Sequence, residues 1–270
     1  MSNMRRLASS GRHSAAAATS AGNPDLQGHA QSYWDWPRTN HSRVARELGV
    51  DIVSGRFREN SFLPGDTELL SRFRVSRTVL REALKTLSAK GLIQAKAKIG
   101  TRVLERRFWN LFDPAVLHWH AEAGIGPQFL LSLSEMRLAL EPEAAALAAM
   151  RHSPEHLVEL YRCVELMARG DQTGPEFVES DLLFHVAVAA ASRNPFMRSI
   201  STLIEVALVT TFQFSSPVPG SSEHKVVVGR HRAVADAIAQ GEQLAAREAM
   251  RAVVCDSIDR LRGSGGTDVV

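Results

Sequence analysis

The chain has 270 residues, which is enough for two domains that each bury a hydrophobic core. No apolar run approaches the ~18 residues that a membrane-spanning helix needs, so no association with a membrane is expected. The two cysteines, Cys163 and Cys255, lack the spacing of a metal or redox motif, which argues against a disulfide framework and favours the reducing cytoplasm.

The net charge of +3 is divided unevenly along the chain. Residues 38–107 contain 16 Lys and Arg against 7 Asp and Glu, a balance of +9. Residues 108–270 contain 13 against 20, a balance of −7, and residues 1–37 supply the remaining +1. A basic first module followed by an acidic second one predicts a polyanionic partner for the first module only.

Residues 1–37 are rich in Ala, Ser, Gly and Asn and show no apolar periodicity, so we expect a disordered tail. From about Thr39 to Ser54, apolar residues recur at helical spacing and predict a first amphipathic helix. A second, short helix is expected from Thr67 to Phe73, with Asp66 as its N-cap. A tight connection then leads to a third helix.

The third helix, within residues 75–93, is the most informative element of the chain. Ser76 is a good N-cap, and Gly91 ends the helix as a C′ residue would. One face carries a continuous apolar stripe formed by Val79, Leu80, Ala83, Leu84 and Leu87. The opposite face carries Arg77, Thr78, Arg81 and Lys85. Periodicity alone is equally compatible with an ordinary solvated face, and the neighbouring elements favour a DNA-reading role.

Residues 92–104 alternate apolar and basic side chains around Ile99 and Gly100, which predicts a two-stranded hairpin. The side chains expected to face inward are Leu92, Ile93, Val103 and Leu104, and those expected to project are Lys96, Lys98 and Arg102. Two short helices joined by a brief turn make a helix-turn-helix, and the basic hairpin adds a wing. Residues 38–107 are therefore predicted to form a winged helix-turn-helix DNA-binding domain.

Four stretches between about residues 41 and 104 carry a specific pattern: IVSGRF, LPG, VSRTVLREALKTLSAKGLI and IGTRV. Together they resemble the DNA-binding domain of the GntR family of bacterial repressors. The resemblance implies that Arg77 and Arg81 contact bases or phosphates in the major groove, which suits the planar arginine fork. With the backbone-contacting and wing residues, the expected DNA-binding set is Ser76, Arg77, Thr78, Arg81, Lys85, Lys98, Gly100 and Thr101.

The sequence departs from the GntR pattern at two positions. Arg74 stands in the turn where a glycine is usual, and Thr67 stands where some members carry a further DNA-contacting arginine. The operator sequence of other members therefore does not transfer to this chain.

Residues 108–126 predict a linker with one short helix, which Asp113 and Pro114 begin as N-cap and first residue. Trp109 and Trp119 are expected to be packing anchors between the domains rather than ligand platforms. Residues 127–262 read as helix after helix, with Pro, Gly or Ser at each break. The fold class is thus mainly α, with a C-terminal antiparallel bundle of six or seven helices for effector binding and dimerisation. Residues 263–270 are expected to be a flexible C-terminus.

The bundle contains one cluster of metal-ligating residue types. Asp181 and His185 lie one turn apart on one helix face, and His224 and His231 lie two turns apart on nearly the same face of a later helix. A carboxylate and imidazoles that converge in a bundle core suit a divalent transition metal such as zinc or nickel. By spacing alone, a capped or core-satisfied histidine is the commoner outcome.

Three stretches of the bundle are similar to the FCD effector domain of the FadR-type branch of the GntR family: RLALEPEAAALAA, DLLFHVAVAAASRNP and HRAVADAIAQGE. The resemblance implies that Asp181, His185 and His231 are metal ligands and that Arg137 clamps a carboxylate effector. Further candidates for the effector pocket are Asn194 and His224. Glu141 is expected to be a structural partner, with a pocket role left open.

The last histidine of the FCD pattern falls at Val253, which cannot ligate a metal. Three possibilities stay open: a three-ligand site completed by water or effector, a site that borrows His224, or no metal at all. The stretch LERRFWNLFDPAVLHW also resembles the sub-group of such repressors that responds to sugar acids, galactonate among them.

The sequence as a whole predicts a cytoplasmic, homodimeric transcriptional repressor that is not an enzyme. It would bind a double-stranded DNA operator and be released by a small carboxylate or sugar acid. One alternative is a constitutive DNA-binding protein with a structural bundle, which no metabolite would loosen from DNA. The other is a metalloenzyme that activates water at the bundle site, although no general base is well placed.

Overall fold

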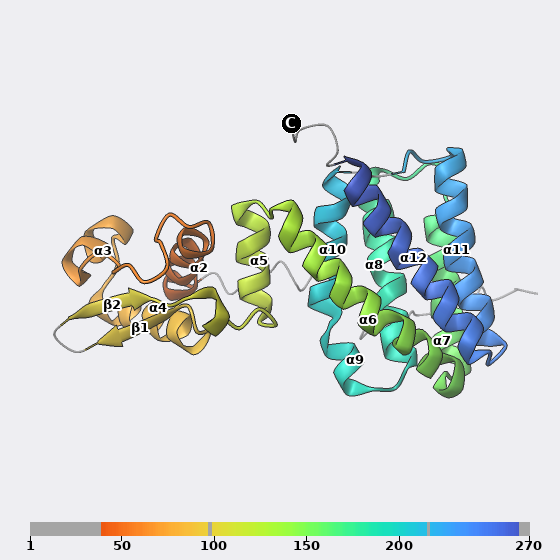
Figure 1. The fold of residues 1–270 in the computed structure, drawn as a ribbon, viewed down its shortest axis with the longest axis horizontal. Helices are drawn as coiled ribbons and strands as arrows, with labels where there is room; N and C mark the ends of the chain where they lie inside the picture. The colour runs from red at the N-terminus through yellow and green to blue at the C-terminus, as the bar shows by residue number, and fades with distance from the viewer. Residues whose placement is uncertain (1–38, 97–98, 215–216, 265–270) are drawn as a thin grey trace, which may run out of the picture.

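The computed structural model describes residues 39–96, 99–214 and 217–264. A small N-terminal part with a two-stranded hairpin and a larger helical part lie on either side of helix α5, Pro114–Ala123 (Figure 1). The predicted fold class, mainly α with a winged helix-turn-helix and a helical bundle, is confirmed. The tail predicted for residues 1–37, Lys98 and residues 265–270 lie outside the described residues.

The N-terminal part is a winged helix-turn-helix. Its elements are α2 (Asn40–Val53), α3 (Asp66–Phe73), α4 (Arg77–Ala89), β1 (Ile93–Lys96), β2 (Gly100–Val103) and the 3-10 helix η1 (Arg106–Phe108). The two strands are antiparallel, with Ile93 opposite Val103, and a bridge from Phe62 to Arg102 adds the segment before α3 to the sheet. Apolar side chains of all three helices and the hairpin share one core.

The ends of these helices follow local hydrogen-bonding rules. Ser76 caps α4 as predicted, because its hydroxyl accepts from the backbone N–H of Val79. The prediction that Asp66 caps α3 is wrong, since Gly65 occupies the N-cap position and Asp66 is the first helical residue. Its carboxylate there complements the positive end of the helix dipole. Arg74 ends α3 in the left-handed conformation (φ 53°), which a glycine would adopt with less strain.

Helix α5 is packed firmly against the winged helix. Trp119 lies against Gly49 of α2, where a Cβ atom would come within 2.3 Å of the indole ring. Arg46 of α2 pairs with Glu122 through two contacts of 2.8 and 2.6 Å, and Trp109 Nε1 donates to the carbonyl of Leu104 at 3.0 Å. Both tryptophans therefore anchor α5 in the core of the N-terminal part.

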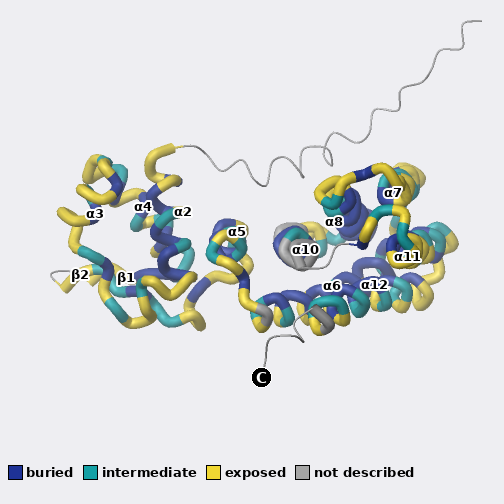
Figure 2. Tube along the Cα trace, turned by 90° about the horizontal axis from the view of Figure 1, so that it is seen from above, coloured by how far each residue is buried: buried dark blue, intermediate teal, exposed yellow. Residues whose placement is uncertain are grey.

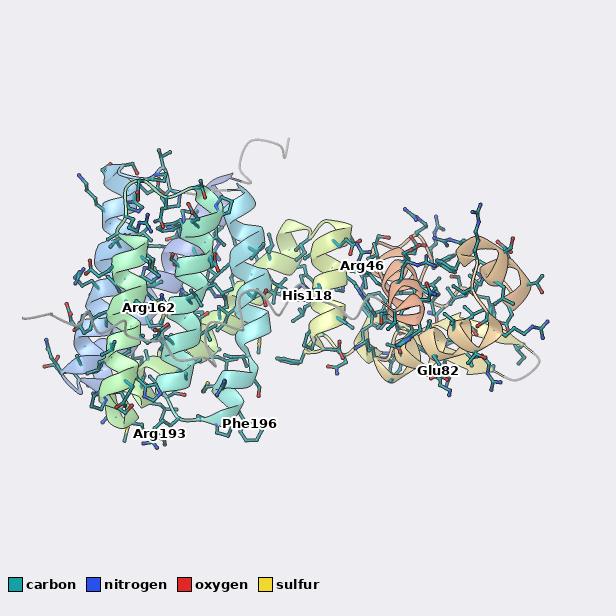
Figure 3. The ribbon with its side chains drawn as sticks, turned by 180° about the vertical axis from the view of Figure 1, so that it is seen from behind. Arg46, Glu82, His118, Arg162, Arg193 and Phe196 are labelled. Carbon is teal, nitrogen blue, oxygen red and sulfur yellow. The ribbon has the colours of Figure 1, made fainter. Side chains whose placement is uncertain are left out.

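The other side of α5 belongs to a different core. Leu117 packs with Leu130 of α6 and with Leu203, Val206 and Ala207 of α10. Figure 3 shows Arg46 at the boundary between α2 and α5, and His118 at the boundary between α5 and α10. Helix α5 thus contacts the winged-helix part with one face and the bundle with the other.

Seven helices form the bundle, within the predicted range of six or seven. They are α6 (Pro127–Arg151), α7 (Pro154–Met167), α8 (Gly174–Ala191), α9 (Pro195–Ser199), α10 (Ser201–Phe214), α11 (Ser222–Ala239) and α12 (Gln243–Ser264). Helices α6 and α12 lie side by side along one face of the bundle, α7 and α8 lie across from them, and α11 lies between α7 and α12 (Figure 2). None of the helices in the described ranges is long and apolar enough to cross a membrane.

Helix α8 packs against α6, α7, α9 and α10. Thr173 and Glu176 form a capping box at its start, and from Phe177 onward most of its side chains are buried on every side. From Ser180 to Ala191 the helix offers little solvent-facing surface for polar residues. Asp181 and His185 on α8 are consequently fixed inside the core, where each must find polar partners from neighbouring helices.

Candidate functional site

Helix α4 presents the face predicted to read DNA. Leu80, Ala83 and Leu87 are buried against the winged-helix core, which leaves the opposite face to solvent. The exposed residues of that face are Ser76, Arg77, Thr78, Arg81 and Lys85. Lys85 pairs with Glu82 at 2.8 Å, whereas neither Arg77 nor Arg81 has an ion-pair partner within the described part of the chain. The two arginines are therefore positioned to bind a phosphate or a base edge.

The hairpin supplies the second element of this interface. Gly100 begins β2 at a positive φ of 125°, and Thr101 follows it half-buried in the strand. Ile99, at the tip, is 66% exposed, and Lys98 is not described. Gly91, which ends α4 at φ 76°, lies so close to Phe108 that a Cβ atom would come within 2.1 Å of its carbonyl oxygen.

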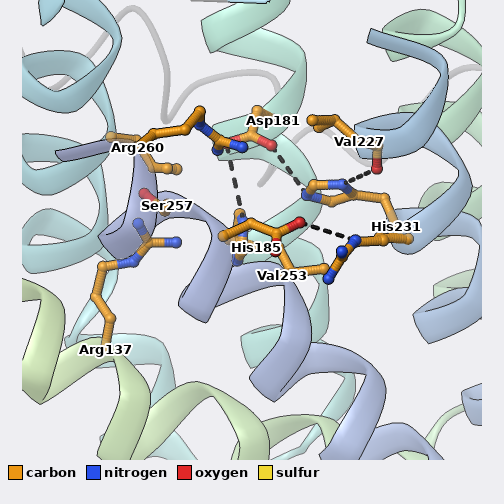
Figure 4. Close-up of a pocket in the computed structure, with 11 residues that line it drawn as sticks. Arg137, Asp181, His185, Val227, His231, Val253, Ser257 and Arg260 are labelled. Atoms are coloured by element: carbon orange, nitrogen blue, oxygen red, sulfur yellow. Dashed lines mark hydrogen bonds and ion pairs between the residues drawn. The ribbon is translucent and has the colours of Figure 1, made fainter. Parts of the chain in front are cut away.

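A second polar site lies inside the bundle. Five ionisable side chains meet there, each at most 2% exposed: Arg137 and Glu141 of α6, Asp181 and His185 of α8, and His231 of α11. The two α6 residues and the two α8 residues are each four positions apart, so each pair shares one helix face. Figure 4 shows the side chains of Asp181, His185 and His231 converging between α8, α11 and α12.

The two histidines point the same ring nitrogen at the same carboxylate. His231 Nε2 lies 2.9 Å from Asp181 Oδ1, and His185 Nε2 lies 3.9 Å from Asp181 Oδ2. One ligand atom from each residue falls within 4.8 Å of the other two. The Nδ1 atoms face away, to Glu141 Oε2 at 2.5 Å for His185 and to the Val227 carbonyl at 2.8 Å for His231.

This arrangement fits a divalent metal ion. His231 Nδ1 must carry its proton in order to donate to the Val227 carbonyl, so a neutral ring directs the Nε2 lone pair at Asp181. A lone pair and a carboxylate oxygen 2.9 Å apart require a proton or a cation to relieve their repulsion. One carboxylate and two Nε2 donors, with each Nδ1 held by an acceptor, is a donor set that zinc and nickel take.

Both carboxylates of the cluster are held in their ionised form. Arg137 Nε lies 2.5 Å from Glu141 Oε1. Burial raises the pKa of Glu141, but Arg137 and then His185 outweigh it and hold this pKa at about 2. Burial likewise raises the pKa of Asp181, and His231, His185 and Arg137 lower it to about 2. Arg260 also lines the adjoining cavity, so two guanidinium groups, Arg137 and Arg260, lie near the two carboxylates.

A small cavity of about 10 Å³, the size of one water molecule, adjoins the cluster. Arg137, Asp181, His185 and His231 contribute to one side of it, and helix α12 forms much of the other. The α12 residues share one face at helical spacing: Val253, Asp256, Ser257 and Arg260. Because Val253 lies in this wall, α12 brings an apolar side chain where a fourth ligand was expected.

The structure does not bring Asn194 or His224 to this cavity. His224 Nε2 lies 2.8 Å from the Met167 carbonyl and its ring packs against Phe177, so its polar atoms are engaged elsewhere in the core. The position of His224 therefore does not support a metal site that includes this residue. The Asn194 side chain caps the short helix α9 by accepting from the Phe196 N–H at 3.0 Å.

Sequence reasoning missed the polar residues of α11 and α12 at this site. Arg230 Nε pairs with Asp256 Oδ2 at 2.8 Å, and Ser257 and Arg260 follow on the same α12 face. The α12 residues could have been found from their spacing, because Asp256, Ser257 and Arg260 follow Val253 by three, four and seven positions and so share its helix face. Glu141 was expected to be a structural partner, with a pocket role left open, and its spacing of four from Arg137 is typical of a helical ion pair.

Comparison with known proteins gives the class of the molecule. Residues 40–103 match the family described as bacterial regulatory proteins, gntR family, and residues 132–255 match the FCD domain. The chain therefore belongs to the GntR family of transcriptional regulators, in the branch that carries an FCD domain, and it is not an enzyme.

Several relatives are matched over most of this chain and most of their own length. The chain is 32% identical over 213 residues to the HTH-type transcriptional regulator YieP of Escherichia coli K12, covering 78% of this chain and 90% of YieP. It is 30% identical over 220 residues to the galactonate operon transcriptional repressor of the same organism, covering 82% and 96%. It also resembles the putative L-lactate dehydrogenase operon regulatory protein of E. coli K12, at 28% identity over 80% and 84% of the two chains.

Among solved structures, the fold resembles Lar, described as controlling the expression of the Listeria monocytogenes agr system. The TM-score is 0.58 and the identity 19%, with 84% of this chain and 98% of Lar covered. At this identity the likeness shows the shared fold alone.

Proposed function

We propose that this protein is a cytoplasmic transcriptional repressor that a small hydroxycarboxylate or sugar acid releases from its operator. As a homodimer, it would present two α4 helices and two hairpins to the half-sites of a pseudo-palindromic operator. The observation that carries the effector-dependent part is the buried cluster of Asp181, His185, His231 and Arg137 in a bundle attached to a winged helix.

Asp181, His185 and His231 would hold a divalent transition metal such as zinc or nickel. The ion would supply a Lewis-acidic centre that binds carboxylate and hydroxyl oxygens. Charge supports an anionic effector: Arg137 and Arg260 already lie near the two carboxylates Glu141 and Asp181, so a divalent cation would make the buried site net positive. A carboxylate would reduce that charge, with Arg137 of the neighbouring helix able to orient it.

The size of the cavity supports coupling between effector binding and a conformational change. A space of about 10 Å³ holds a water molecule but not a sugar acid, so the surrounding helices must separate to admit one. An effector that binds only the opened arrangement shifts the protein toward it, by an amount set by its differential affinity for the two states.

Packing provides a route from this cavity to the DNA-binding part. Leu208 of α10 lines the cavity, and Val206 and Ala207 of the same helix pack in the core that also holds Leu117 of α5. The opposite face of α5 is anchored in the winged helix by Trp119. A displacement of α10 would therefore move α5, and the movement of α5 would change the orientation of α4.

The names of the relatives support a sugar acid or hydroxy acid as effector. One related repressor controls a galactonate operon, and another relative is assigned to an L-lactate dehydrogenase operon. We propose the same chemical class for this chain: a carboxylate with at least one hydroxyl group that can reach the metal.

The test is thermal unfolding of the full-length protein with zinc or nickel, in the presence of galactonate or L-lactate, with and without EDTA. Operator binding is followed in parallel by gel shift. We expect one acid to raise the melting temperature, to lose this effect on chelation, and to weaken the DNA complex. A constitutive DNA-binding protein would instead keep its operator in the presence of every acid and show no acid-dependent shift.

A further inference from the structure

The turn between α3 and α4 holds an arginine in a backbone conformation that arginine rarely adopts. Arg74 has a φ of 53° and a ψ of 49°, which lie in the left-handed region. A side chain with a Cβ atom is strained in this region, whereas glycine enters it freely. Such strain persists where the surrounding fold or the function of the side chain requires it.

The fold does not use the Arg74 side chain. The basic groups beside it hold the helices together: Arg72 pairs with the buried carboxylate of Asp51 at 2.5 Å, and Arg43 Nη2 donates to the Phe73 carbonyl at 3.0 Å. Because Arg43 already satisfies a carbonyl at the end of α3, that helix does not need a second arginine as its cap. Arg74 is exposed, and within residues 39–96, 99–214 and 217–264 its guanidinium has no hydrogen-bond or ion-pair partner.

The position of Arg74 is close to where a helix-turn-helix meets the DNA backbone. In this motif the first helix crosses the backbone and the start of the recognition helix enters the major groove. Arg74 ends α3 and precedes Arg77, the first residue of α4, by three positions, so their Cα atoms are at most ~11 Å apart. The major groove is about 12 Å wide, and phosphates border it. Helix α3 also lies on the side of the winged helix away from the bundle, which leaves this turn uncovered (Figure 1).

We propose that Arg74 binds a DNA phosphate at the edge of the major groove that α4 enters. The planar fork of the guanidinium suits a phosphate, and such a contact fixes the position of the recognition helix without reading sequence. The strained turn thus lowers the stability of the free protein and raises its affinity for DNA. These two effects are measured separately, and neither depends on the effector site in the bundle.

The experiment first selects a tightly bound duplex from a pool of random sequences with the full-length wild-type protein, and a scrambled duplex represents non-specific DNA. Affinity for both is measured by fluorescence anisotropy between about 50 and 200 mM KCl for the wild type, Arg74→Ala, Arg74→Gly and Arg74→Lys. Melting temperature and circular dichroism are measured without DNA. Arg193→Ala and Arg193→Gly are matched controls, because Arg193 is also an exposed arginine, with φ 51°, but lies on the bundle (Figure 3).

We expect Arg74→Ala to bind both duplexes about tenfold more weakly than the wild type at about 50 mM salt. Loss of one phosphate contact lowers the slope of log K against log salt by about 0.9 per protomer, so this difference should shrink about threefold at about 200 mM. Arg74→Gly should lose the same affinity and yet melt at a higher temperature than the wild type, because glycine removes the strain. Arg74→Lys should retain part of the affinity, since it keeps the charge but loses the fork.

The control variants separate strain from DNA binding. Arg193→Gly should raise the melting temperature as Arg74→Gly does, while both Arg193 variants keep the affinity and salt slope of the wild type. Two results would overturn the proposal. Wild-type affinity and salt slope in both Arg74→Ala and Arg74→Gly would show a solvated arginine, and a loss confined to the selected duplex would show a contact to a base instead of a phosphate. If Arg74→Ala loses its helical spectrum, Arg74→Gly decides.

Discussion

The Nε2 atom of His231 lies 2.9 Å from Oδ1 of Asp181, while the Nδ1 atom of the same ring donates to the Val227 carbonyl. The hydrogen bond to Val227 therefore fixes the orientation of the His231 ring, and Nε2 is directed at the Asp181 carboxylate on another helix. This relationship connects α11 to α8 where the donor atoms of Asp181, His185 and His231 come together. Its consequences are open to direct measurement.

Removing the carboxylate should remove the metal. We expect Asp181→Asn to lower the zinc content of purified protein from about one ion per protomer to near zero, because the amide has neither the charge nor the donor strength of the carboxylate. Metal content is measured by atomic absorption. His224→Gln is the control and should keep the ion, since His224 bonds the Met167 carbonyl instead. Loss of metal in His224→Gln would contradict the three-ligand site.

The basic face of α4 should be tested at Arg81. We expect Arg81→Ala to weaken operator binding by ~1–3 kcal/mol and to relax sequence preference if the contact is a bidentate one to a base. The melting temperature should not change, because Arg81 is exposed and forms no ion pair among the described residues. Affinity is measured by fluorescence anisotropy at fixed salt, with Arg169→Ala on the bundle as the control. Equal operator affinity for the wild type and Arg81→Ala would show that the face is merely solvated.

Docking of α5 on α2 depends on the absence of a side chain at Gly49. A Cβ atom there would lie 2.3 Å from the Trp119 ring, so Gly49→Ala should destabilise the protein by roughly 1–3 kcal/mol through overpacking. Gly229→Ala is the matched control: it lies inside α11, and a Cβ there meets nothing within 4 Å. This second substitution should stabilise by about 0.5–1 kcal/mol. Chemical denaturation measures both, and equal effects would refute the close contact.

Glu205 of α10 should make stability depend on pH. It is 1% exposed, neither carboxylate oxygen has a hydrogen-bond partner among the described residues, and burial raises its pKa to about 8. A raised pKa means that the folded protein prefers the protonated acid. The unfolding free energy should therefore be highest below pH ~4.5 as far as this group is concerned, and fall by a few kcal/mol as pH rises to about 8.

Glu205→Gln should remove this dependence, because the amide cannot ionise. The melting temperature of the variant should therefore exceed that of the wild type by more at pH 8 than at pH 5. Glu179→Gln, an exposed carboxyl on α8, should leave the dependence as it is in the wild type. A Glu205→Gln variant whose pH profile follows the wild type would assign the effect to another group.

Periodicity and capping chemistry were sufficient to predict most of the elements. The alternation of apolar and basic positions in α4, with Ser76 before it and Gly91 after it, specified a helix with one exposed basic face. The N-cap of α3 was placed wrongly because Gly65 and Asp66 are both acceptable in that position. The choice between them depends on how the loop before the helix packs, which local sequence does not contain.

The sequence by itself also determined that Asp181 and His185 share a face, because residues four apart on a helix always do. Spacing left both His224 and His231 as candidates, because they lie two turns apart on one helix, and the resemblance to the FCD domain pointed to His231. The tertiary structure shows which of the two reaches Asp181. The packing of α11 against α8 brings His231 to Asp181 and leaves His224 at Met167. The same packing joined Glu141 to His185 and turned Ser257 and Arg260 of α12 toward the cavity. Contacts between helices depend on their relative rotation and offset, and no periodicity within one helix encodes either.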